Sequence, residues 1–188
     1  PMLFTENYYR DLIAKLGIPE MPIKKVLFKK DYLSNCPKLY NDFFKISKKL
    51  MQFVYYNNIE DLIGANFSHE SIMKMRDGIL PENIDIYLKV PFEYGGTIEF
   101  SNMFLIKKRP FKDLIDSFID EQVLTFNRSN GNFNRESGYQ YPTELYIPNP
   151  KGIIFLPALK GFAGAGGNTS ADIMTEIGST MFSKSGGF

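Results

Sequence analysis

The hydrophobic period of this sequence changes at Pro81, and that change constrains the fold more than any other feature. Upstream, apolar residues recur every three or four positions, most clearly from Pro37 to Phe53, which is the spacing of an amphipathic helix. Downstream, apolar and polar residues alternate over 84–88, which is typical of a strand. The sequence therefore predicts an α+β fold with a helical N-terminal half.

Three helices are expected before Pro81. The first covers Glu6 to Leu16, the second begins at Pro37, and the third follows the N-cap Ser68 and ends at Asp77. The expected apolar face of the second helix is Leu39, Phe43, Ile46, Leu50 and Phe53.

The second half predicts a strand, a loop, a strand and a helix, followed by irregular chain and two short strands. Gly95 and Gly96 mark the turn between the first two strands, and Pro110 is expected at the first position of the helix. The expected ranges are 84–88 and 103–106 for these strands, 127–140 for a loop or flexible excursion, and 144–147 and 152–156 for the short strands.

Composition excludes several kinds of site. The chain has 188 residues, as expected for one domain with an appended arm. Because His69 and Cys36 are its single histidine and cysteine, it can form no two-histidine metal site, no internal disulfide and no cysteine zinc cage by itself. The net charge of +1 argues against a globally basic nucleic-acid binder, although residues 1–50 hold ten Lys and Arg against five Asp and Glu.

The segment from Ser68 to Pro81, followed by Ile86 to Phe92 and by Gly95-Gly96-Thr97, resembles HNH nuclease toxin domains of the colicin-like and Rhs polymorphic toxins. The similarity continues from Phe100 to Ile106 and from Pro110 to Lys112. It implies a ββα-metal core in which two strands and a helix hold one divalent cation beside the scissile phosphate. It also implies a bacterial effector, and a cognate immunity protein as one candidate partner.

The same comparison places other residues where the family has its histidines. Tyr87 and Leu88 occupy the positions of the His-His pair, and Lys112 falls near the histidine at the start of the helix. A phenol is a weak base at neutral pH, leucine has no lone pair, and lysine repels a cation. We therefore expect no HNH catalysis, no catalytic residue and no cofactor. Asn102 matches the middle asparagine and is interpreted as a loop-capping amide.

Carboxylates near this motif leave an enzyme as the alternative. Asp85, Glu93 and Asp113 could hold Mg²⁺ in octahedral oxygen geometry and rebuild a nuclease site. Charged residues at strand ends are more often only solvated, which is the competing interpretation.

Lysines on the second helix are candidates for nucleic-acid binding. Lys45, Lys48 and Lys49 could meet phosphates, although charge runs of this kind usually only solvate a helix face. Aromatic residues interleave with lysines from Tyr8 to Tyr56, as in single-strand binding surfaces, but helical spacing is expected to place most of them in the core.

Glycines crowd the last 29 residues, which we expect to form an arm. The segment lacks the Lys-Ser/Thr of a phosphate-binding P-loop. The arm suits an interface with a protein partner or a second copy of the chain, and a self-assembling subunit is thus a further alternative function. The candidate interface residues are Gly161, Phe162, Gly164, Gly166 and Gly167.

Together these features predict a toxin-derived, catalytically degenerate HNH-like domain that acts by binding a protein partner, its own copies or nucleic acid. No apolar run approaches a membrane span and no Sec-type signal is seen, so we expect the bacterial cytoplasm or delivery by a non-Sec secretion system. The expected segments are a helical region (1–66), an HNH-like core (67–125), a loop and β extension (126–159) and the arm (160–188).

Overall fold

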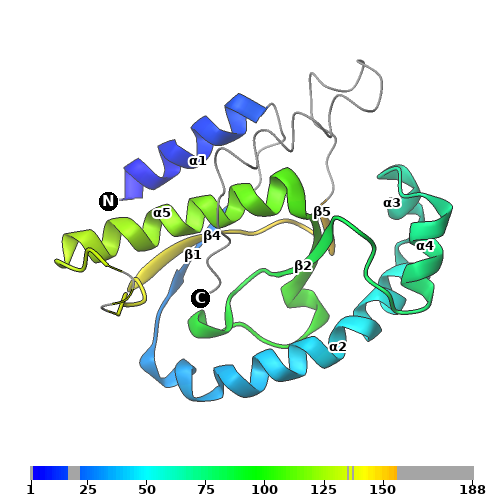
Figure 1. The fold of residues 1–188 in the computed structure, drawn as a ribbon, viewed down its shortest axis with the longest axis horizontal. Coiled ribbons are helices and arrows are strands. Elements are labelled where there is room, and N and C mark those ends of the chain that lie inside the picture. The colour runs from blue at the N-terminus through cyan, green and yellow to red at the C-terminus, as the bar shows by residue number, and fades with distance from the viewer. Residues whose placement is uncertain (1, 17–21, 135, 137, 156–188) are drawn as a thin grey trace. The chain divides into compact units, whose positions relative to one another are not determined.

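A computed structural model describes residues 2–16, 22–134, 136 and 138–155 of the chain (Figure 1). The fold is α+β, as the sequence predicts. The chain forms two compact units, described separately below. Of the described residues, the first unit holds those within 2–28 and 109–149, and the second holds 29–108 and 150–155. The division of the chain into a helical region, an HNH-like core, a β extension and an arm stays a prediction. The two compact units show which residues pack together, and this does not test that division.

The second unit builds its core from a mixed sheet and helices. Its sheet has the order β2-β3-β5, with β2 antiparallel and β5 parallel to the central β3. Residues 103–106 of β3 are fully buried, as expected of a central strand covered on both faces. The elements are η1 (Lys30–Asn35), α2 (Cys36–Asn57), α3 (Ile59–Gly64), α4 (His69–Arg76), β2 (Ile84–Leu88), η2 (Phe92–Tyr94), η3 (Phe100–Asn102), β3 (Met103–Lys107) and β5 (Ile154–Phe155).

The long helix α2 contributes Leu50, Met51 and Val54 to this core. Phe53 was expected on the buried face and is instead 40% exposed. The expectation was wrong because Met51 and Val54 lie on the side of α2 that meets the core, and Phe53 lies beyond the edge of that side.

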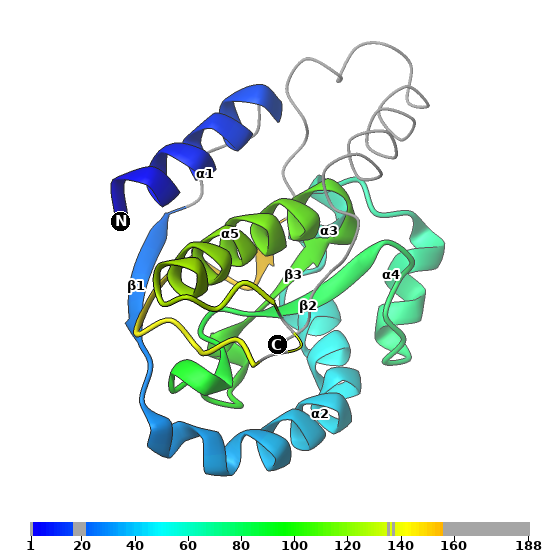
Figure 2. The ribbon, with the colours of Figure 1, turned by 60° about the vertical axis from the view of Figure 1, so that its left-hand side comes forward.

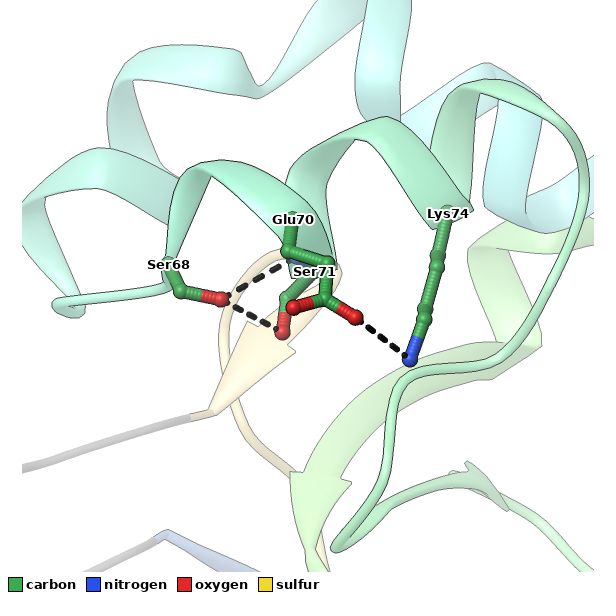
Figure 3. A network of polar contacts seen from close by, with 4 residues as sticks. All are labelled: Ser68, Glu70, Ser71 and Lys74. Atoms are coloured by element: carbon green, nitrogen blue, oxygen red, sulfur yellow. Dashed lines mark hydrogen bonds and ion pairs between the residues drawn. The ribbon is translucent and has the colours of Figure 1, made fainter.

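The start of α4 follows its sequence signal. Ser68 Oγ accepts a hydrogen bond from the amide of Ser71 at 3.1 Å, and Glu70 pairs with Lys74 one turn later at 3.4 Å (Figure 3). The helix ends before Gly78, whose φ of +77° is the left-handed conformation that glycine adopts without strain. The predicted cap Ser68 is confirmed, and the helix ends at Arg76, one residue before the predicted end at Asp77.

The first unit pairs two helices with a two-stranded antiparallel sheet, β1-β4. Figure 2 shows α1 alongside α5. Tyr8 and Ser117 share a 2.7 Å hydrogen bond between hydroxyls, and the Tyr9 ring packs on Phe118 at 4.7 Å. The elements are α1 (Met2–Leu16), β1 (Ile23–Leu27), η4 (Lys108–Lys112, whose first residue belongs to the second unit), α5 (Asp113–Ser129) and β4 (Glu144–Pro148).

A glutamine side chain ties α5 to β4. Gln122 Nε2 donates to the carbonyl oxygen of Tyr146, and Gln122 Oε1 accepts from the Tyr146 amide, each at 2.7 Å. The amide of one side chain therefore satisfies both backbone groups that Tyr146 directs away from β1.

The chain after α5 corrects another expectation. The irregular segment was expected from Asn127, but α5 continues to Ser129 and Asn127 is fully buried. Asn127 Nδ2 donates to the carbonyl oxygens of Val123 and Gln140, and its Oδ1 accepts from the Gln140 amide. The bond to Val123 lies within α5, and the two bonds to Gln140 hold the far end of the segment that follows the helix. Asn127 therefore belongs to the helix and also closes the loop after it.

Helix α5 also starts later than expected. Pro110 was placed at its first position, but it lies in η4, and the regular helix begins at Asp113. Arg109 has extended backbone angles, which interrupt helical geometry just before the proline. Within the described ranges, no helix has both the length and the apolar character needed to span a membrane.

Candidate functional site

The turn between β2 and β3 is held by the side chain of Asn102. Its Oδ1 accepts from the Val90 amide at 2.9 Å, and its Nδ2 donates to the carbonyl oxygens of Val90 and Thr97 at 3.0 and 2.9 Å. One buried amide therefore satisfies three backbone groups of a turn that has no strand partner. The loop-capping interpretation of Asn102 is confirmed.

Two glycines allow the same turn to close tightly. Gly95 has a φ of +90°, and the Tyr32 ring lies 2.9 Å from where its β-carbon would be. A β-carbon on Gly96 would overlap the carbonyl oxygen of Val90. Both positions therefore require glycine, the first for conformation and space and the second for space.

The carboxylate of Glu93 lies inside this turn. Glu93 is 3% exposed, and the Tyr40 hydroxyl from α2 lies 2.7 and 2.8 Å from its two oxygens and donates to the carboxylate. The ring of Phe92 meets the Tyr40 ring edge-on at 4.8 Å. A buried carboxylate is stable only with such a donor, so the pair joins α2 to the turn.

The thiol of Cys36 lies close to this pair. It is buried and donates to the carbonyl oxygen of Tyr32 at 3.2 Å. Burial, and secondarily the charge of Glu93, raises the pKa of the thiol above its ordinary value. Since the thiolate is the nucleophilic form, this shift makes Cys36 less nucleophilic than an exposed cysteine.

The three residues at the expected histidine positions are held by their own neighbours. Tyr87 is half-buried, with its ring 5.5 Å from that of Phe104. Leu88 packs on the core of the second unit. In the first unit Lys112 Nζ pairs with Asp116 at 3.0 Å, with both side chains largely covered. None of the three supplies a neutral imidazole or carboxylate for water activation.

The three carboxylates considered for a metal site differ in their surroundings. Glu93 faces Tyr40, and Asp85 Oδ1 accepts from the Ile86 amide at 2.8 Å. In the first unit, the pKa of Asp113 is raised by burial and secondarily by Asp116. Arg109 and Lys112 oppose that shift. Across the described part of the chain, no three His, Cys, Asp or Glu side chains gather in a way that could hold a metal ion.

The candidate lysines Lys45, Lys48 and Lys49 are all exposed on α2. The hydrocarbon stem of Lys48 occupies the space beside Gly78, which positions this side chain over the end of α4.

Three exposed aromatic side chains accompany these lysines, whereas most of the rings from Tyr8 to Tyr56 are buried or half-buried. Phe44 is 74% exposed, Tyr56 71% and Phe53 40%. The exposure of Phe44 and Tyr56 could have been predicted from the sequence. Both residues fall outside the expected apolar stripe of the helix, and both are at helical spacing from lysines. The candidate arm residues Gly161, Phe162, Gly164, Gly166 and Gly167 lie outside the residues that the structure describes.

Comparison with protein-family models, with curated proteins and with solved structures finds no match to this chain. The resemblance to HNH toxin domains therefore stands on its own residues, from Ser68 to Lys112.

Proposed function

We propose that this chain is a domain of HNH toxin ancestry that has lost nuclease chemistry and acts by binding. The proposal accounts for a well-built turn between β2 and β3 beside residues that cannot carry out HNH nuclease hydrolysis. The domain would bind one of three classes of ligand: a protein partner, further copies of the chain, or nucleic acid.

The observation that carries the proposal is the turn held by Asn102. The asparagine that resembles the middle residue of the HNH motif makes three hydrogen bonds that shape the turn, and Gly96 fits against Val90 as such a turn requires. The neighbouring positions, by contrast, carry a half-buried phenol and a packed leucine. The chain therefore has the asparagine that shapes the turn but lacks, at the matched positions, side chains that could activate water. This combination fits a binding domain better than a nuclease.

A nuclease rebuilt on carboxylates is the competing function. Its strongest candidate ligand, Glu93, is already engaged by Tyr40 in the interior. Because Glu93 is 3% exposed, a hydrated Mg²⁺ could reach its carboxylate only if the turn opened.

The deciding experiment is a cleavage assay on supercoiled plasmid and on RNA with Mg²⁺, Mn²⁺, Zn²⁺ or Ni²⁺. The folded protein should leave both substrates intact with every metal. Asp85→Asn and Glu93→Gln serve as test variants and the exposed Glu82→Gln as their matched control. Cleavage that disappears in the test variants and persists in the control would replace this proposal with the rebuilt metal site.

A further inference from the structure

The outward side of α2 carries an unusual combination of charge and exposed rings. Lys38, Lys45, Lys49 and Tyr56 follow one another at intervals of seven, four and seven residues, which places them in one row along the helix. All four are exposed. The one acidic residue of α2, Asp42, is half-buried. Asp42 lies four residues after Lys38 and three before Lys45, so it borders this row, and the three lysines leave the row with a net positive charge.

Rings flank and end this row. Phe44 lies one turn before Lys48, and Phe53 one turn after Lys49. Phe44 and Phe53 are nine residues apart and therefore project from opposite edges of the row, while Tyr56 ends it; all three rings are exposed. We call this side, defined by its four lysines and three rings, the α2 outer face.

Each exposed ring is braced by another ring of the protein. Phe53 packs on Phe100 at 5.1 Å between centroids, and Tyr56 meets Tyr55 edge-on at 4.9 Å. Phe44 lies 6.2 Å from Phe43. Braced rings lose little freedom when a ligand stacks on them, so they suit recognition of flat groups.

We propose that the α2 outer face binds single-stranded nucleic acid, with its lysines contacting phosphates and its exposed rings stacking on bases. The inference rests on the proposed function, because it names the ligand of the binding domain. Basic residues that follow the backbone, interleaved with aromatic side chains, are the general means by which proteins hold single strands without reading sequence. A duplex offers its bases already stacked and so leaves these rings without a partner.

A membrane surface fits the same residues less well. Helices that lie in the membrane interface separate their apolar side from their lysines. On α2 the side opposite the lysines is occupied, since Leu50 and Val54 are fully buried in the protein core. Tyr56 instead lies in the lysine row and Phe44 and Phe53 border it on either side, so bases could stack next to the phosphate contacts.

The test is fluorescence anisotropy of the full chain with labelled oligothymidylate and oligouridylate, longer than the ~4–16 nucleotides that one single-strand site commonly covers. Phe44→Ala and Tyr56→Ala should each weaken binding about fivefold to a hundredfold, since stacking on one base contributes that much. Phe133→Ala is the matched control, because Phe133 is 76% exposed and lies in the other unit. It should leave the affinity unchanged.

The lysines are tested by salt dependence. In Lys45→Gln/Lys49→Gln, the slope of log affinity against log salt should fall by about 1.4, which is the loss of two phosphate contacts to a single strand. Lys15→Gln/Lys151→Gln, which changes two exposed lysines outside α2, should keep the slope.

Four results would overturn the inference. The first is binding that Phe44→Ala and Tyr56→Ala leave unchanged, and the second is equal or tighter binding of the matching duplex. The third is association with vesicles of phosphatidylserine and phosphatidylcholine in place of the oligonucleotides. Failure to bind any oligonucleotide would also overturn it, yet would leave the loss of nuclease chemistry untouched. Conversely, metal-dependent cleavage of the oligonucleotide would contradict the proposed function and not the binding face.

Discussion

The hydroxyl of Tyr40 lies 2.7 and 2.8 Å from the two carboxylate oxygens of Glu93, although the residues are 53 positions apart in the chain. The contact joins a helix to an irregular turn through a charge that is 3% exposed. A buried carboxylate that loses a donor bears the full cost of its desolvation. Tyr40 is therefore expected to stabilise the turn more than an ordinary surface tyrosine.

Replacing Tyr40 by Phe should lower the free energy of unfolding by about 1–3 kcal/mol, since one hydroxyl is removed from a buried anion. Urea denaturation followed by circular dichroism measures it. Tyr56→Phe removes the same atom at a side chain that is 71% exposed and should change stability little. Equal losses in the two variants would show that the Tyr40 contact has no special weight.

Asn102→Ala should cost about 2–4 kcal/mol, because three hydrogen bonds to backbone groups of Val90 and Thr97 disappear together. Hydrogen exchange at the Val90 amide should accelerate more than exchange in β3. Asn57→Ala is the control, because its amide makes a single exposed hydrogen bond to Phe53. An unchanged Val90 exchange rate in Asn102→Ala would refute the role of this side chain as the clamp of the turn.

Two glycines should respond to alanine in opposite directions. Gly96→Ala forces a β-carbon against the Val90 carbonyl and should destabilise by about 2–3 kcal/mol. Gly64→Ala, at the end of α3, meets nothing within 4 Å and should stabilise by about 0.5 kcal/mol through reduced backbone entropy of the unfolded chain. Thermal unfolding of both variants checks the pair, and a destabilised Gly64→Ala would contradict the open space seen there.

The elements that sequence reasoning identified are those whose signals are local. The cap Ser68, the alternation over 84–88 and the Pro37 start of α2 each act within a few residues, so the sequence shows them directly. The strand β1 was missed because its sequence contains Lys24 and Lys25 side by side, and its partner β4 lies more than a hundred residues later.

The contacts of the site were harder to predict, because they join residues that are far apart in the sequence. The interpretation of Asn102 as a loop-capping amide came from its resemblance to the middle asparagine of HNH domains, and its side chain makes three hydrogen bonds to backbone groups of Val90 and Thr97. The contact of Glu93 with Tyr40 depends on how α2 packs on that turn, which no periodicity encodes. In the same way, helical spacing narrows the buried side of α2 to a stripe, but packing decides that Met51 belongs to it and Phe53 does not.

Asp113 should make stability fall as the pH rises. Its pKa is raised, first by burial and then by the charge of Asp116, so the folded state holds the proton more tightly than the unfolded state. Between the ordinary aspartate pKa and the raised value, folding binds protons, and stability decreases with increasing pH until the penalty is complete above the raised pKa. Asp113→Asn should remove this dependence and unfold at higher urea than the wild type at neutral pH, while the two proteins converge in acid. A difference that stays constant across the acidic range would show that the effect of Asp113 is not electrostatic.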